Sequence, residues 1–205
     1  MKQKLAAFTT FRQGDSANPV EAARAEVVLD TADALRANDI PCLTVFTDTE
    51  PDSVATLIER GMHMRPQREP GSVHARREAL IAALEEFPDA EYFLWLEPEK
   101  PGIPPLAQKL LAQMERDHAE LGLFNRTSME SYPQEQAYYY LFCRTVASKL
   151  LTMDIDYAFG PMIVARSAAH YFLDYDIGTS GHQWDALLVP RLLMIKEGRP
   201  VTILP

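Results

Sequence analysis

Short apolar runs alternate with longer segments of helical periodicity through the first 125 residues of the chain. The apolar runs have the length of buried strands, and the segments between them repeat apolar residues every three or four positions. Strands that are apolar throughout are typical of parallel sheets that helices cover on both faces. The alternation therefore predicts an α/β fold with a mostly parallel open sheet and helices on both faces. The predicted strands are residues 5–10, 42–46, 62–67, 91–97 and 121–125, and the predicted helices are residues 19–38, 52–59, 72–86 and 106–118.

The remaining residues give a weaker pattern. Residues 137–151 read as either a helix or an aromatic strand, and a last helix is predicted near residues 184–198. The aromatic cluster Tyr138, Tyr139, Tyr140 and Phe142 is expected to pack against the sheet, with an acceptor groove as the alternative. Because the chain has 205 residues and neither a repeat nor a low-complexity linker, we expect a single domain over residues 1–205.

Charge and composition limit the kinds of binding partner and the compartment that we expect for this chain. The net charge of -9 and the lack of any long basic run argue against a nucleic-acid partner, because such binding rests on clustered Lys and Arg. A few local arginines or a divalent cation could still hold a small phosphorylated ligand. Without a signal peptide or an apolar run of about 20 residues, no membrane span is expected and the cytoplasm is the expected compartment. Cys42 and Cys143 are expected to be buried free thiols.

The residues that follow the predicted strands are the first candidates for a site, because ligands of open parallel sheets bind at the carboxyl ends of the strands. The first strand ends at Thr10 and is followed by Arg12, and the second is followed by Thr47 and Asp48. The hydroxyl of Thr47 and the carboxylate of Asp48, both after the second strand, could bond a ribose or a base. Asp48 is equally well explained as a turn or helix-capping residue.

The segment Glu97-Pro98-Glu99 follows the strongly apolar fourth strand. An extended backbone spaces the two carboxylates by about 6 to 7 Å, close enough to share one hard cation and its phosphate ligand. We therefore expect Mn²⁺ or Mg²⁺ at Glu97 and Glu99. The alternative is a solvated acidic turn whose shape Pro98 fixes.

This order of elements, ending in an acid-x-acid pair after an apolar strand, resembles the first half of the GT-A type glycosyltransferases. Those enzymes use an Asp-x-Asp motif for the metal and the nucleotide diphosphate, and the glutamates above stand in its place. The resemblance implies a nucleotide-sugar donor, with Thr10 and Arg12 near the nucleotide and Asp48 near the base or ribose. It also places Arg76 or Arg77 near the base or phosphates, although two adjacent arginines on a glutamate-rich helix could instead form surface ion pairs.

The second half of the chain matches this family at three features. Gly160 would lie beneath the donor sugar, where a side chain would obstruct close approach. Asp185 is the candidate base for the acceptor hydroxyl, with Asp176 as its rival and a helix-capping role as the alternative. His182 and Trp184 flank the same loop. The nucleotide-binding half is then about residues 1–125, and the acceptor half about residues 126–205.

The sequence thus predicts a metal-assisted glycosyltransferase that moves a sugar from a nucleoside-diphosphate-sugar donor to an acceptor hydroxyl. A catalytically silent nucleotide-sugar-binding or scaffold protein is the alternative, because Glu replaces Asp at both acidic positions. A nucleotidyltransferase ranks last, since that class usually has a Gly-rich basic loop after its first strand, and residues 12–19 contain one Gly and one Arg.

Overall fold

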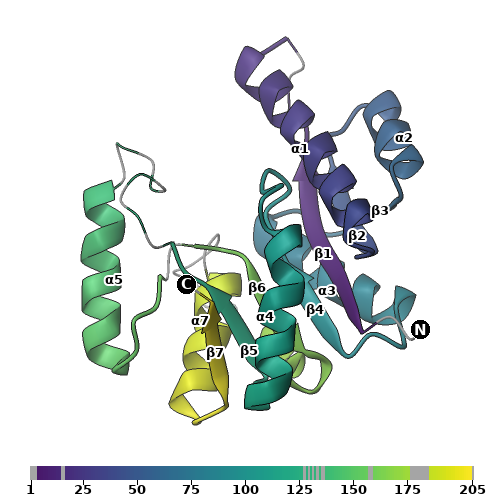
Figure 1. Ribbon diagram of the computed structural model, residues 1–205. Coiled ribbons are helices and arrows are strands. Elements are labelled where there is room, and N and C mark those ends of the chain that lie inside the picture. The colour runs from purple at the N-terminus through teal and green to yellow at the C-terminus, as the bar shows by residue number, and fades with distance from the viewer. Residues whose placement is uncertain are drawn as a thin grey trace.

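One seven-stranded sheet with the strand order β3-β2-β1-β4-β6-β5-β7 organises the computed structural model (Figure 1). The structure describes residues 4–14, 17–126, 128, 130, 132, 134, 137–156, 159–175 and 185–204. The strands are β1 (Leu5–Arg12), β2 (Cys42–Thr47), β3 (Met62–Pro66), β4 (Tyr92–Trp95), β5 (Leu121–Phe124), β6 (Met162–Ala165) and β7 (Val201–Leu204).

Because β1, β2 and β4 are parallel neighbours, their carboxyl ends lie at the same edge of the sheet. β1 pairs in parallel with β2 and β4, and β2 pairs in parallel with β3. β6 runs antiparallel to both of its neighbours, β4 and β5, while β7 is parallel to β5. The prediction of a mostly parallel sheet is confirmed, and β1, β2 and β4 end at the same edge of it.

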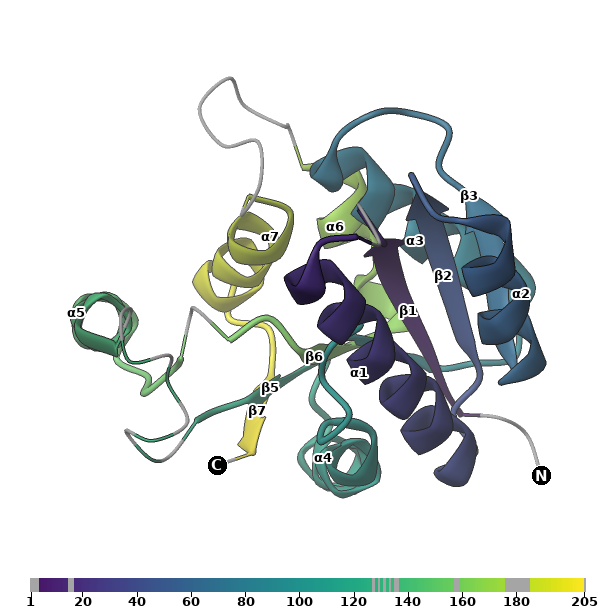
Figure 2. The same cartoon turned by 90° about the horizontal axis from the view of Figure 1, so that it is seen from above.

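Helices cover both faces of this sheet (Figure 2). The apolar side chains of each strand alternate between two cores, as the period of an extended chain requires. In β1, Phe8 belongs to the core that includes side chains of α3, α6 and α7, whereas Ala7 belongs to the core that includes those of α1, α2 and α4. The helices are α1 (Pro19–Ala37), α2 (Pro51–Glu59), α3 (Ser72–Glu86), α4 (Pro104–Asp117), α5 (Ala137–Leu151), the 3₁₀ helix η2 (Arg166–Ala168), α6 (His170–Asp174) and α7 (Asp185–Lys196).

Residues that the sequence already marks as helix-capping residues set the start of α1 and the end of α2. The Asn18 Oδ1 atom accepts a hydrogen bond from the backbone N–H of Val20 at 2.9 Å, and Pro19 occupies the first turn of α1. Gly61, which follows the C-cap residue of α2, has a φ of 92°, a conformation that favours glycine. Both predicted helix boundaries are confirmed.

Helix α5 corrects one expectation. Residues 137–151 form a helix, but Tyr138, Tyr139 and Phe142 are 87%, 67% and 68% exposed rather than packed against the sheet. In both views α5 stands apart from the other helices. The faces of the sheet beside β5 are already covered, because side chains of α4 and α7 fill the two cores there.

No helix in the described part of the chain is both long and apolar enough to span a bilayer.

The two cysteines have different environments. Cys42 is buried, as expected, and its burial raises the pKa of the thiol to about 12. Cys143 is only half-buried on α5, so the expected burial of that thiol is wrong. Both are free.

We expect Ellman's reagent to modify one thiol per folded chain at about pH 8, because Cys42 is shielded and stays protonated. The second thiol should react only after denaturation. In the Cys143→Ser variant the rapid reaction should vanish. Two rapidly reacting thiols in the folded protein would contradict the burial of Cys42.

A substitution at Gly122 of β5 tests how closely α4 packs against this strand. A Cβ atom added there would lie 3.1 Å from Leu110 atoms and would collide with the Met114 sulfur. Overpacking of this kind costs about 1–3 kcal/mol, so Gly122→Ala should lower the free energy of unfolding in urea by that amount. Gly102→Ala is the matched control, because nothing lies within 4 Å of an added Cβ there. Equal effects from the two substitutions would contradict the packing.

Candidate functional site

A cavity of about 440 Å³ lies where β1, β2 and β4 end, with the first half of α3 along its side. Its position agrees with the rule that ligands of open α/β sheets bind at the carboxyl ends of the strands. The segments that form it are far apart in the sequence. It is lined by six of the predicted site residues, namely Thr10, Arg12, Asp48, Arg76, Glu97 and Glu99.

The ends of β1 and β2 contribute an ion pair to the cavity. The Arg12 Nε atom lies 3.3 Å from the Asp48 Oδ2 atom, and both side chains are exposed. Asp48 has a φ of 45°, in the left-handed region that Asp tolerates better than most residues, and this turn ends β2. The exposed side chains leave this pair free to rearrange around a ligand.

The two neighbouring arginines of α3 have different surroundings. The Arg76 guanidinium lies in the cavity wall, 5.6 Å from the centre of the Trp95 ring. Burial lowers the pKa of Arg76, and the negative charge of Glu97 offsets part of that effect. The Arg77 guanidinium instead donates to the Tyr175 carbonyl and lies 4.5 Å from the centre of the Tyr175 ring. Arg77 therefore joins α3 to the end of α6, and only Arg76 lines the cavity.

Strand β4 ends at Trp95, two residues earlier than predicted, so Glu97 lies in the loop that follows. The Thr9 hydroxyl donates to the Leu96 carbonyl at 2.7 Å and fixes the start of this loop against β1. The Glu97 Oε2 atom is buried and has no hydrogen-bond partner among the described residues. Burial raises the pKa of Glu97, while the positive charges of nearby side chains partly oppose this; those side chains are Lys100, Arg191 and Arg76.

Gly160 lies directly against Glu97. A Cβ atom added to Gly160 would lie 2.7 Å from the Glu97 carboxyl carbon, so only glycine fits without a shift of that side chain. The Arg191 guanidinium, itself 1% exposed, donates to the Phe159 carbonyl at 3.1 Å and to the Gly160 carbonyl at 2.6 Å. Helix α7 thereby fixes the backbone that faces Glu97.

Glu99 already has a cationic partner. Its Oε1 atom accepts from the Arg24 Nη2 atom at 2.6 Å and from the Arg24 Nε atom at 2.9 Å. No cluster of three or more His, Cys, Asp or Glu side chains suited to a metal ion occurs among the residues that the structure describes. Both Arg24 bonds go to the Oε1 atom of Glu99, so a divalent cation between Glu97 and Glu99 would have to share Glu99 with a guanidinium, and the donor set fits the predicted metal poorly.

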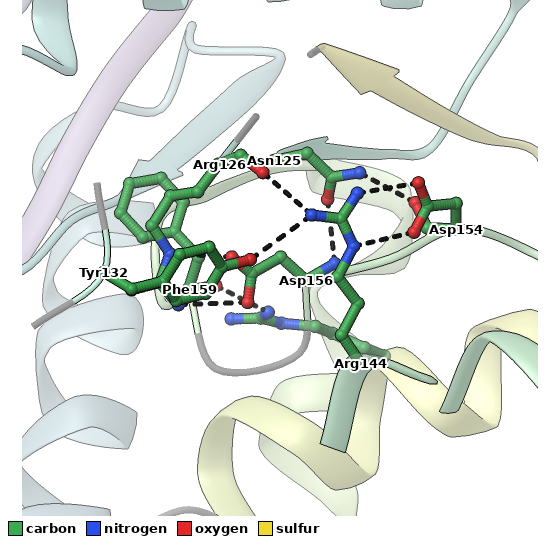
Figure 3. A network of polar contacts seen from close by, with 8 residues as sticks. Asn125, Arg126, Tyr132, Arg144, Asp154, Asp156 and Phe159 are labelled. Atoms are coloured by element: carbon green, nitrogen blue, oxygen red, sulfur yellow. Dashed lines mark hydrogen bonds and ion pairs between the residues drawn. The ribbon is translucent and has the colours of Figure 1, made fainter. Parts of the chain in front are cut away.

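A polar network that the sequence analysis did not identify joins the end of β5 to the segment before Gly160 (Figure 3). The Arg126 Nε and Nη2 atoms donate to the Asp156 carboxylate at 2.7 and 3.0 Å. The side chains of this pair are 10% and 0% exposed. The rings of Tyr132 and Phe159 lie 4.1 and 5.1 Å from the Arg126 guanidinium carbon.

A second pair extends this network to α5. The Arg144 guanidinium donates to both oxygens of Asp154 at 2.7 Å and to the Arg126 carbonyl at 2.9 Å. Asn125 donates to the Asp154 carbonyl at 2.7 Å and accepts from the Asp156 backbone N–H at 2.9 Å. The contact with Arg144 lowers the pKa of Asp154. The network therefore fixes residues 154–156, which follow α5, against the end of β5.

Of the two predicted catalytic acids, only Asp185 lies within the residues that the structure describes. Asp185 is the first residue of α7, in agreement with its predicted position near a helix start. Asp176, His182 and Trp184 lie outside the described residues. The roles of Asp185 and Asp176 stay predictions.

By sequence, the chain matches no protein-family model and no curated protein. By structure, it is similar to glucosyl-3-phosphoglycerate synthase from Mycobacterium tuberculosis in complex with phosphoglyceric acid. The TM-score is 0.67 at 10% identity, over 98% of this chain and 69% of that chain. A structure of the same synthase in complex with Mn²⁺, uridine diphosphate and phosphoglyceric acid gives a TM-score of 0.66 at 11% identity, over 98% of this chain and 68% of that one.

The chain is also similar to CMP:2-keto-3-deoxy-manno-octonic acid synthetase complexed with CTP. That comparison has a TM-score of 0.59 at 13% identity and covers 98% of this chain and 89% of that chain. Identities this low show the fold alone. The chain therefore has the GT-A type fold, as the resemblance in its sequence implied.

The buried ion pair between Arg126 and Asp156 should contribute far more to stability than the ion pair between Arg144 and the exposed Asp154. Removing one member of a buried ion pair typically costs about 3–5 kcal/mol, so Asp156→Ala should lower the free energy of unfolding in urea by about that much. Asp154→Ala is the control, because the Asp154 side chain is 69% exposed and such pairs contribute about 0–1 kcal/mol. Similar losses for both variants would contradict the assigned difference.

Proposed function

We propose that this chain is a glycosyltransferase that moves a sugar from a nucleoside-diphosphate-sugar donor to an acceptor hydroxyl. The cavity at the carboxyl ends of β1, β2 and β4 supports this most directly, because six residues predicted from sequence line it. The GT-A type fold supports it as well, since solved structures of similar fold hold uridine diphosphate or CTP.

In this proposal the cavity holds the nucleotide. Asp48 and Thr10 lie at strand ends where they can bond the ribose or base, while Arg12, Arg24 and Arg76 can face the phosphates. Glycine at position 160 leaves room for the donor sugar beside Glu97.

The transfer itself forms one bond and breaks another. The acceptor oxygen attacks the anomeric carbon, and the bond from that carbon to the diphosphate oxygen breaks. The nucleoside diphosphate leaves with the bonding electrons, and the proton of the acceptor hydroxyl passes to a carboxylate. Asp185, at the start of α7, is the proposed base, and Asp176 is its alternative.

Assistance by Mn²⁺ or Mg²⁺ is the form of this activity that the sequence predicts. Mn²⁺ accompanies uridine diphosphate in a solved structure of similar fold. In this chain, however, the Oε1 atom of Glu99 is paired with Arg24.

A catalytically silent nucleotide-sugar-binding protein is the second candidate. The observation that favours it is that two cavity carboxylates, Asp48 and Glu99, are each paired with an arginine. Release of nucleoside diphosphate from a panel of UDP, GDP, ADP and CDP sugars would separate the two. Nucleotide binding without release, in the presence of any acceptor hydroxyl tested, would favour the silent protein, and pyrophosphate release from CTP would reveal a nucleotidyltransferase instead.

Asp48→Asn should weaken binding of the preferred nucleoside diphosphate about tenfold, because it removes the charged acceptor proposed for the ribose or base, and the release of Arg12 offsets only part of this loss. Isothermal titration measures this. Asp39→Asn is the matched control, since Asp39 also has a positive φ but precedes β2, at the opposite edge of the sheet. A wild-type protein that binds no member of the panel would refute the proposed function.

A further inference from the structure

The charges at the tip of β4 are opposite in sign to those of the whole chain. The chain carries a net charge of -9, yet the two glutamates that follow β4 are outnumbered by cations. The cationic side chains are Arg24, which bonds Glu99, and Lys100, Arg191 and Arg76, whose charges act on Glu97. Arg24 also contacts Glu21, so four cations face three carboxylates at this tip.

A divalent cation would enter this site at a disadvantage. It would have to share Glu99 with Arg24, which bonds the Oε1 atom of that carboxylate, and the guanidinium groups of Arg24 and Arg76 would lie in the same cavity. Like charges at this range repel, and the low dielectric of a partly buried site strengthens the repulsion.

A diphosphate would find the opposite situation. Arg12 and Arg24 both line the cavity, and their side chains are 69% and 50% exposed. Arg12 lies 3.3 Å from the Asp48 carboxylate, and Arg24 contacts two carboxylates, Glu99 at 2.6 Å and Glu21 at 3.4 Å. A guanidinium binds phosphate oxygens with the same planar pair of donors that it uses for a carboxylate. An incoming diphosphate can therefore take over these donors by exchange.

We propose that Arg12 and Arg24 of the chain itself, rather than a bound divalent cation, neutralise the diphosphate of the ligand in this cavity. The inference rests on the proposed function, because it names how the same cavity holds a nucleoside diphosphate. Asp48 and Glu99 hold the two guanidinium groups in place until the ligand arrives.

The first test measures binding of UDP, GDP, ADP and CDP by isothermal titration in excess EDTA and again in Mn²⁺. We expect the preferred nucleotide to bind with the same affinity in both. Arg24→Gln should weaken that binding about tenfold in both conditions, since it removes a charged donor from the phosphates. Arg36→Gln is the matched control, because Arg36 is also an ion-paired arginine of α1 but contacts Asp33 at 3.1 Å and does not line this cavity.

The second test uses a substitution for which the two explanations predict opposite signs. Glu99→Gln removes a candidate metal ligand but also releases Arg24 from its partner. With a metal at this position, the variant would bind nucleotide more weakly. If arginines hold the phosphates, the variant should bind as tightly as the wild type or a few times more tightly.

The outcomes separate the inference from the proposed function. Nucleotide binding that is lost in EDTA and returns with Mn²⁺ would overturn this inference and leave the proposed function standing. Weaker binding by Glu99→Gln would overturn it as well. If neither condition gives binding of any nucleoside diphosphate, the proposed function fails and this inference fails with it.

Discussion

The backbone of Gly160 lies against the carboxylate of Glu97, and the candidate site depends on this contact because it joins the two halves of the chain. The antiparallel pairing of β4 with β6 explains it. Trp95 is paired with Met162, so continuing the same register by two residues brings Glu97 opposite Gly160. A side chain at position 160 would force Glu97 away and close the space beside the cavity. One strand pairing therefore fixes how the loop after β4 lies against the segment before β6.

At this edge of the sheet, the electrostatic environment of each carboxylate is determined by its neighbouring cations and not by the net charge of the chain. The chain as a whole is acidic, but two cavity carboxylates face arginines and the third, Glu97, lies within the influence of three cations. Burial of Glu97 without a hydrogen bond to one of its oxygens costs free energy. Such costs are retained most often at sites that bind ligands, where local structure is not optimised for stability.

The sequence predicted the site well where parallel strands determine it. Thr10, Asp48 and Glu97 each lie at or just after the end of a recognisable apolar strand. Parallel strands end at a common edge, so the meeting of these residues in one cavity could be inferred without coordinates. The partners of the acids could not be inferred in the same way. Arg24 and Glu99 are 75 residues apart, and no local pattern relates the first turns of a helix to a distant loop.

Other features also depended on long-range packing. Arg76 and Arg77 are adjacent in a helix and so point in directions about 100° apart, but which of them meets the cavity is decided by how α3 lies on the sheet. The buried pair Arg126–Asp156 lies in irregular chain, where no periodicity marks burial. Arg191 did leave a signal, because it falls on the apolar stripe of α7 between Leu187 and Met194, where an arginine needs a buried partner.

Helix α7 connects the proposed chemistry to the fixed backbone at Gly160. Arg191 holds the Phe159 and Gly160 carbonyls, and Asp185 begins the same helix six residues earlier. A helix rises about 1.5 Å per residue, so the backbone of Asp185 lies roughly 9 Å along the axis from the anchored arginine. Pro190 removes one backbone donor inside this helix and allows it to bend between the two positions. The helix whose Arg191 anchors the backbone at Gly160 thus also determines the position of Asp185, the proposed base, relative to that backbone.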